Sequence, residues 1–125
     1  MSQTTGTNTA PGISKTTGAI LFTKLLRQSG IRRVFSLSSN QIMALYDTFI
    51  DAQIEIVHVR HEAAAVHMAD GWARTTGEPG MALVTAGPGH ANSVSALYTA
   101  KCCESPLVIL SGHAPVLNNR EGHFQ

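Results

Sequence analysis

The stretch that decides the fold is IEIVHVRHEAAAVHMADGWARTTG, residues 54–77. Residues 54–59 are rich in β-branched side chains, which is typical of a strand covered on both faces. Helical periodicity follows, because apolar residues recur at i, i+3, i+4 and i+7. This predicted stripe comprises Ala65, Met68, Ala69 and Trp72. Gly77 then provides a C-terminal stop for this helix. Glu62 lies at its other end, where the predicted strand leads into the predicted helix.

Glu62 is the candidate catalytic group, and its position allows two interpretations. In open α/β sheets, ligands bind in the crevice outside the carboxyl ends of the strands, where Glu62 is expected. An acid in the first turn of a helix also complements the positive end of the helix dipole without any further role. Position alone leaves both interpretations open.

The same alternation of strand and helix extends over the rest of the chain. Strands are predicted at residues 33–37, 81–86 and 107–111, and helices at residues 18–29, around 42–49 and at 91–103. Their predicted apolar faces are, in order, Phe22, Leu25, Leu26 and Ser29; Ile42, Leu45, Tyr46 and Phe49; and Ala91, Val94, Tyr98 and Cys102. The second of these helices has side-chain caps available in Ser38, Ser39 and Asn40. This alternation predicts an α/β fold, with an open parallel sheet and helices on both faces.

Length and composition exclude several classes of protein. A chain of 125 residues accommodates one domain, expected at residues 18–125 after a flexible tail at residues 1–17. The net charge of +1 and the short apolar stretches indicate neither a nucleic-acid partner nor a membrane span, and we expect a cytoplasmic protein. Because no helix is predicted after the last strand, the domain is expected to be truncated at its C-terminus. Adjacent Cys102 and Cys103 are expected to be reduced, partly buried thiols.

The segment TAGPGHAN, residues 85–92, partly matches a dinucleotide-binding fingerprint. Gly87 and Gly89 have the G-x-G spacing, but Asn92 replaces the third glycine. The next strand ends in Ser111 and Gly112 instead of a ribose-binding acid, which argues against NAD. The turn still brings bare backbone into the same crevice as Glu62, so a small ring could approach closely.

Metal and nucleophile motifs are weaker. His58, His61 and His67 surround Glu62 in sequence, but a metalloprotease helix needs H-E-x-x-H, and no metal site is predicted in this chain. No serine or cysteine lies in a G-x-S-x-G elbow. Residues 111–113, Ser-Gly-His, are either a ligand contact or a polar turn that closes a strand.

Three segments carry a family resemblance: RHEAAAVHMADGWAR at residues 60–74, GEPGMALVTAGPGHAN at residues 77–92 and PLVILSG at residues 106–112. In this order they make the chain similar to the N-terminal, pyrimidine-binding domain of thiamine diphosphate-dependent enzymes of the acetolactate synthase and benzaldehyde lyase type. The resemblance covers residues 18–125. It implies a carboligase or decarboxylase, a lyase or transferase, acting on 2-oxo acids or aldehydes.

The resemblance also implies roles for individual residues. Glu62 matches the glutamate that hydrogen-bonds the aminopyrimidine ring, which favours the imino tautomer that removes the thiazolium proton to give the ylide. The family's second pyrimidine-facing turn corresponds to Gly87, Pro88, Gly89 and Asn92. Phe124 and Gln125 resemble a segment that lines the substrate pocket, to which His113 is a further candidate.

The match is incomplete in two places. The family's G-x-P-G turn after the first strand is replaced by residues 36–40, Ser-Leu-Ser-Ser-Asn, so substrate contacts from that loop cannot be transferred. The family holds the diphosphate through Mg²⁺ on a separate domain marked by G-D-G, which does not occur here. The resemblance therefore implies a partner, the pyrophosphate-binding domain of a second subunit, within a homodimer or homotetramer, and an inactive chain in isolation.

Three alternatives stay open. The chain could be a separate pyrimidine-domain subunit of a two-chain 2-oxo acid decarboxylase. It could be a non-catalytic relative that keeps the fold and has lost the cofactor, for which the altered turn at residues 36–40 is the only argument. An NAD-binding domain is the third alternative.

Overall fold

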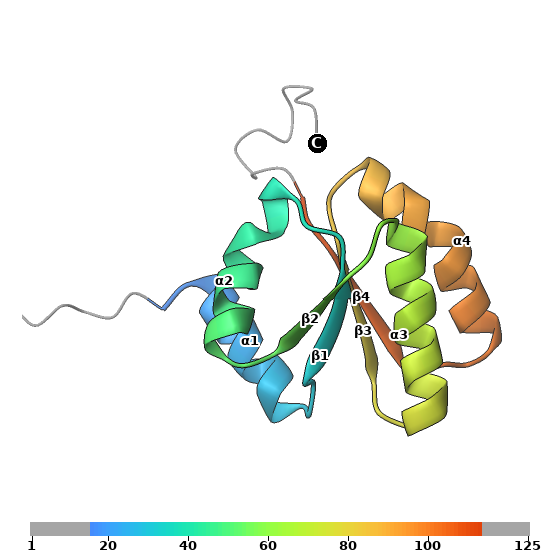
Figure 1. The fold of residues 1–125 in the computed structure, drawn as a ribbon, viewed down its shortest axis with the longest axis horizontal. Coiled ribbons are helices and arrows are strands. Elements are labelled where there is room, and N and C mark those ends of the chain that lie inside the picture. Colours follow the sequence, from blue (N-terminus) through green and yellow to red (C-terminus); the bar gives the residue numbers. More distant parts are fainter. Residues whose placement is uncertain (1–15, 114–125) are drawn as a thin grey trace, which may run out of the picture.

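A parallel four-stranded sheet forms the centre of the structure, a computed structural model that describes residues 16–113 (Figure 1). The elements are, in order, α1 (Gly18–Gln28), β1 (Arg33–Ser36), η1 (Asn40–Ile42), α2 (Met43–Asp51), β2 (Glu55–His58), α3 (Glu62–Thr76), β3 (Gly80–Val84), α4 (Pro88–Cys102) and β4 (Leu107–Ser111). The predicted alternation of strands and helices is confirmed. Nearly all of the tail predicted at residues 1–17 lies outside the described residues.

The strands lie in the order β2-β1-β3-β4, and every neighbouring pair is parallel. The chain therefore runs outward from β1 to the edge strand β2 and then crosses back to β3 on the other side of β1. The direction of winding reverses between β1 and β3, where Phe35 lies opposite Ala82. Such a reversal opens a crevice at the carboxyl ends of the two strands.

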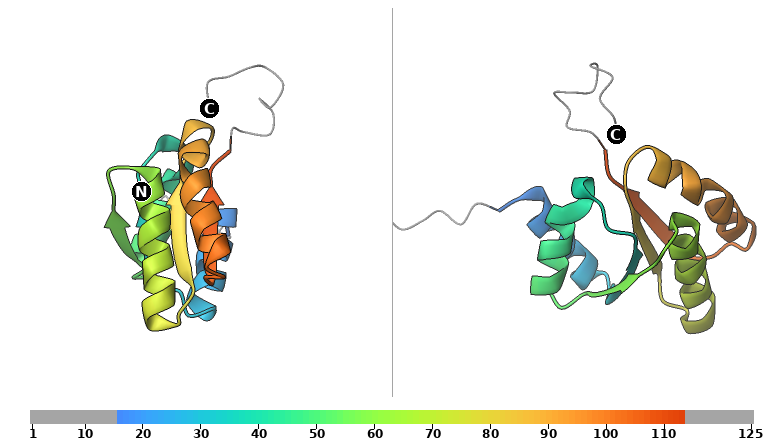
Figure 2. Two further views of the ribbon diagram at one scale, coloured as in Figure 1. Left: turned by 90° about the vertical axis from the view of Figure 1, so that its right-hand side faces the viewer. Right: turned by 45° about the horizontal axis from the view of Figure 1, so that its top comes forward.

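Helices cover both faces of the sheet, as predicted. Two views show α1 and α2 on one face and α3 and α4 on the other (Figures 1 and 2). Successive strand residues point to opposite faces, so Val34 packs with the α1–α2 side and Phe35 with the α3–α4 side. The first core is built around Tyr46 and Phe49, and the second around small residues such as Ala69.

The predicted inward faces of three helices need correction. Leu25 of α1 is 51% exposed and Met68 of α3 is 42% exposed, although both were expected to be buried. The predicted stripe of α4 points outward, with Val94 52% and Tyr98 68% exposed. The residues of α4 that are buried instead are Gly89, Ser93, Ala96 and Ala100. Small side chains lie inward because α3 and α4 pack closely on the sheet, which leaves no space for large ones.

Burial of the strands also differs from the prediction in one case. All five residues of β3 are buried, as two-sided coverage predicts. The strand β2 lies at the sheet edge, with its end residues exposed and Ile56 and Val57 only half-buried, so the prediction of two-sided coverage is wrong for it within residues 16–113. Local β-branched content cannot distinguish an edge strand from a central one.

A buried hydrogen-bond chain fastens α2 to the sheet. The Tyr46 hydroxyl donates to Ser36 Oγ (2.7 Å), and the Ser36 hydroxyl donates to the Leu83 carbonyl (2.7 Å). Burial raises the pKa of Tyr46 above 10.0, against the smaller opposing effect of its hydrogen bond with Ser36. These two hydrogen bonds link α2, β1 and β3 close to the carboxyl edge of the sheet.

Helix ends agree with the sequence in one case and differ in another. Gly77 adopts a left-handed conformation (φ 74°), and its N–H donates to the Ala73 carbonyl, as expected for a C-terminal stop. The predicted capping of α2 is wrong, because Ser39 makes no capping bond and its hydroxyl donates to Gln41 Oε1. A short 3₁₀ turn starts this helix instead. The longest helices of residues 16–113 have 15 residues, and none of the described helices could cross a membrane.

Candidate functional site

Glu62 is the first residue of α3, directly after the turn that follows β2. His61 precedes it with an extended backbone (φ −157°), and its Nδ1 accepts a hydrogen bond from the Ala63 N–H (3.1 Å). This cap starts the helix at Glu62 and gives His61 a structural role. Only 8% of Glu62 is exposed, so its carboxyl group is held at the helix N-terminus and faces inward.

The turn between β3 and α4 lies beside Glu62 in space. Gly87 has φ 56° and ψ −114°, which side chains disfavour, and Pro88 then begins α4, three residues earlier than predicted. A Cβ added to Gly89 would overlap the Thr85 methyl group and lie 3.2 Å from Glu62 Oε1. A glycine is therefore required here, and it keeps bare backbone beside the carboxyl group.

Asn92 connects the two motifs directly. Its side-chain amide Nδ2 donates to Glu62 Oε2 at 3.1 Å, across 30 residues of sequence. Glu62 thus does more than complement the dipole of α3, because it is paired with a side chain of α4. The sequence showed both motifs but not this contact, since nothing in the linear order places α3 beside α4.

The loop after β1 meets the same turn from the other side. The Thr85 hydroxyl lies within hydrogen-bond distance of Ser39 Oγ (2.7 Å) and Gln41 Oε1 (3.0 Å). This network lies at the carboxyl ends of β1 and β3, where the winding reverses. It was not predicted, and it could not be without the strand order, because Ser39 and Thr85 are 46 residues apart.

The segment Ser111-Gly112-His113 lies at the end of β4, a position that fits either interpretation of it. Ser111 is the last residue of β4, and the Gly112 N–H continues the pairing by donating to the Val84 carbonyl (3.0 Å). A Cβ on Gly112 would lie 3.0 Å from the Cβ of Gln41, so the end of β4 packs against η1. His113 is exposed. Phe124 and Gln125, predicted to line a substrate pocket, lie outside the described residues.

The histidines and cysteines of the described residues form no metal-binding cluster. Within residues 16–113, no group of three or more His, Cys, Asp or Glu side chains is placed to hold a metal ion. Cys102 and Cys103 are free but exposed, so the prediction of partial burial is wrong. Cys102 lies on the outward face of α4, and Cys103 follows the last residue of that helix.

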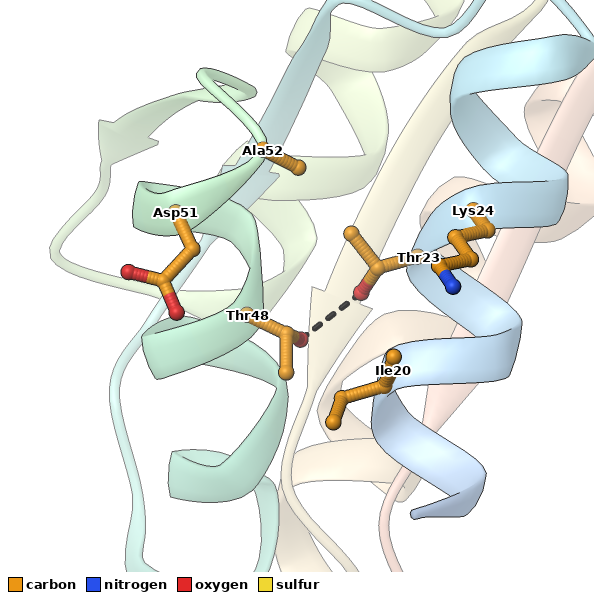
Figure 3. Close-up of a pocket in the computed structure, with 6 residues that line it drawn as sticks. All are labelled: Ile20, Thr23, Lys24, Thr48, Asp51 and Ala52. Carbon is orange, nitrogen blue, oxygen red and sulfur yellow. Dashed lines mark hydrogen bonds between the residues drawn. The ribbon is translucent and has the colours of Figure 1, made fainter. Parts of the chain in front are cut away.

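Of the hollows in the described part of the chain, one lies near these residues and another lies apart from them. One of about 370 Å³ lies at the carboxyl ends of β1 and β2 and is lined by Leu37, Ser38, His58, Val59 and Arg60. It adjoins the turn that leads to Glu62 and has a positive charge from Arg60. The other, of about 290 Å³, lies between α1 and α2, where Thr23 and Thr48 are hydrogen-bonded at 2.7 Å (Figure 3). Glu62 lies on the opposite side of the sheet from this second hollow, which is therefore separate from the candidate site.

These features define a class of protein: a parallel α/β domain with a nearly buried acid beside a glycine turn at the carboxyl edge of its sheet, the edge where open α/β sheets bind ligands. A family model described as thiamine pyrophosphate enzyme, N-terminal TPP binding domain, matches residues 16–125. The chain belongs to this family. Thiamine pyrophosphate is the same compound as thiamine diphosphate.

Curated relatives agree with this assignment. The chain is 40% identical over 119 residues to a probable acetolactate synthase of Mycobacterium bovis, covering 95% of this chain and 22% of the relative. It is 41% identical over 111 residues to the acetolactate synthase large subunit of Haemophilus influenzae, covering 88% and 19%. It is 45% identical over 96 residues to the acetolactate synthase isozyme 3 large subunit of Escherichia coli, covering 76% and 17%. The chain therefore spans about a fifth of the length of these relatives.

Proposed function

We propose that this chain is the aminopyrimidine-binding domain of a thiamine diphosphate-dependent carboligase or decarboxylase acting on 2-oxo acids or aldehydes, with Glu62 as its catalytic residue. The observation that carries the proposal is the nearly buried Glu62 carboxyl group beside the bare backbone of Gly89. The names of the relatives, which are acetolactate synthases, support the substrate class.

The described residues fit the aminopyrimidine ring. A flat heteroaromatic ring needs close approach of the backbone and a carboxyl group in its plane. Gly89 provides the first, because any side chain there would occupy the space next to Glu62 Oε1. Glu62 provides the second, because the first residue of α3 holds its carboxyl group beside the glycine turn.

In the proposed reaction, residues of this chain hold the cofactor's ring and exchange a proton with it. When bound, thiamine diphosphate supplies a nucleophilic thiazolium carbon and an electron sink for the carbonyl substrate. Glu62 holds a proton at its carboxyl group and shares it with the ring nitrogen para to the exocyclic amine. Gly87, Pro88 and Gly89 are proposed to form one wall of the ring pocket, with the buried Gly89 closest to Glu62. His113, Phe124 and Gln125 are proposed to line the substrate pocket.

The remaining parts of the site are proposed to come from a second subunit. Thiamine diphosphate carries a diphosphate that needs Mg²⁺, and residues 16–113 contain no metal-binding cluster. We therefore assign Mg²⁺ and the diphosphate to the pyrophosphate-binding domain of a partner subunit in a homodimer or homotetramer. This chain alone is expected to be inactive.

The outward face of α4 is the proposed contact with the second subunit. This face comprises Ala91, Val94, Tyr98 and Cys102, all exposed within residues 16–113. Tyr98→Asp in the full-length protein is expected to weaken self-association about 30-fold or more. Tyr98 is exposed in this chain and would be buried at the proposed contact, where tyrosines are frequent hot spots. Sedimentation velocity over a dilution series measures the change. Leu25→Asp, on the 51% exposed Leu25 of α1, is the matched control, and equal effects of the two variants would contradict the assignment.

Calorimetric titration of the full-length protein tests the proposed function. We expect saturable binding of thiamine diphosphate in the presence of Mg²⁺, at one cofactor per pyrimidine-binding domain, and no binding of NADH. Absence of thiamine diphosphate binding would contradict the proposal and favour a non-catalytic relative, and binding of NADH alone would favour a dinucleotide site. Binding that requires a second, different polypeptide would identify a separate pyrimidine-domain subunit.

A further inference from the structure

The two oxygens of the Glu62 carboxyl group have different surroundings. Oε2 accepts the hydrogen bond from the Asn92 amide at 3.1 Å. Oε1 lies beside Gly89, where an added Cβ would be only 3.2 Å away, and no hydrogen bond to it is seen among residues 16–113. Every fully buried side-chain nitrogen or oxygen in the described part of the chain has a partner, so Oε1 must reach the crevice surface.

The Asn92 amide also determines where a proton on this carboxyl group can lie. An N–H that points at Oε2 favours Oε2 as the acceptor oxygen, which leaves Oε1 as the oxygen free to exchange a proton with a bound ring. A bond of this kind also restricts rotation of the carboxyl group, which otherwise exchanges its two oxygens. The Asn92 amide therefore orients the Glu62 carboxyl group.

We propose that Asn92 is a positioning residue that orients Glu62 so that Oε1, and not Oε2, meets the aminopyrimidine ring. This inference rests on the proposed function, and it replaces the expectation that Asn92 contacts the cofactor itself. Asn92 acts through Glu62, because its donor is already directed at the carboxyl group. The ring then occupies the side of Glu62 that faces Gly89.

A double-mutant cycle in the full-length protein tests this role. The variants are Glu62→Gln, Asn92→Leu and the two combined. Two quantities are measured: the affinity for thiamine diphosphate by calorimetry, and the rate of deuterium exchange at the thiazolium C2 position of the bound cofactor by NMR after acid quench. C2 exchange needs no substrate, so it reports on Glu62 directly.

The expected result is strong non-additivity. Loss of the donor to a nearly buried acceptor costs enough that Asn92→Leu should slow C2 exchange about 10-fold to 100-fold when Glu62 is present. In protein that already carries Glu62→Gln, the same substitution should change the rate by less than about 3-fold, since no oriented acid remains to be lost. Affinity should fall less than the exchange rate, because the ring pocket formed by the glycine turn is intact.

Each other outcome overturns a separate statement. If Glu62→Gln leaves C2 exchange at the wild-type rate, the proposed function fails. If Glu62→Gln slows exchange but Asn92→Leu slows it equally in both backgrounds, Asn92 touches the ring and the positioning role is wrong. An unchanged rate in Asn92→Leu overturns it as well. Asn92→Asp, which keeps the shape of Asn92, serves if the Leu variant does not fold, and Gln28→Leu, at an exposed amide on α1, is the control with an unchanged rate.

Discussion

Glu62→Gln in the full-length protein is expected to slow product formation and C2 proton exchange of bound thiamine diphosphate by about 100-fold to 10,000-fold, the usual effect of losing a positioned acid–base group. The substituted amide has the size of the carboxyl group but cannot give up and regain a proton. Because glutamine has the shape of glutamate and Glu62 lies at the start of α3, outside both apolar cores, its replacement leaves the sheet and its cores in place. Steady-state kinetics and C2 exchange measure the two rates.

The control for this prediction is Glu78→Gln. Glu78 is exposed and lies in the turn after α3, at the opposite end of that helix from Glu62. Its replacement removes the same charge and should leave both rates within about 2-fold of wild type, since surface substitutions are usually near neutral. A wild-type rate of C2 exchange in Glu62→Gln would show that this acid does not act on the cofactor.

Gly80→Ala is expected to destabilise the domain by about 3 kcal/mol or more, at the upper end of overpacking effects. A Cβ at Gly80 would overlap the carbonyl oxygen of Ala69 and lie 2.7 Å from its carbonyl carbon. Both are backbone atoms of α3, so no side chain can rotate to make space. The whole helix would have to move away from β3, which disrupts the core around Ala69 and displaces Glu62.

Urea unfolding followed by circular dichroism measures this loss. Gly71→Ala is a matched control in the interior of α3, where an added Cβ meets nothing within 4 Å. It should stabilise the helix by up to about 1 kcal/mol, the difference in helix propensity between the two residues. Equal stability of Gly80→Ala and wild type would contradict the close approach of α3 and β3. The two glycine variants must shift the urea midpoint in opposite directions.

Much of the fold could be predicted from local sequence. The strand at Leu107–Ser111 agrees residue for residue, and Gly77 ends α3 in the left-handed conformation that a glycine permits. Apolar periodicity also identified the inward face of α2, with Tyr46 and Phe49 buried. These features depend on neighbours within about one or two helical turns, so the linear order contains the information for them.

The site could be predicted in part. Glu62 and the glycine turn were predicted as candidate site residues because each motif is contiguous and lies where a strand leads into a helix. The hydrogen bond from Asn92 to Glu62 was not predicted. The hydrogen-bond network of Ser39, Gln41 and Thr85 was not predicted either. Both depend on which strands are neighbours, which periodicity does not determine.

The sequence by itself determined the order of strands and helices, the helix stop at Gly77 and the placement of Glu62 at a strand-to-helix junction. Only the tertiary structure decided the strand order β2-β1-β3-β4, the inward face of α4 and the pairing of Glu62 with Asn92. The reason is steric. Close packing of α4 on α3 and the sheet favours small side chains on its inner face, so Ala96 and Ala100 lie inside while Val94 and Tyr98 face outward, against the rule that the larger apolar residues are buried.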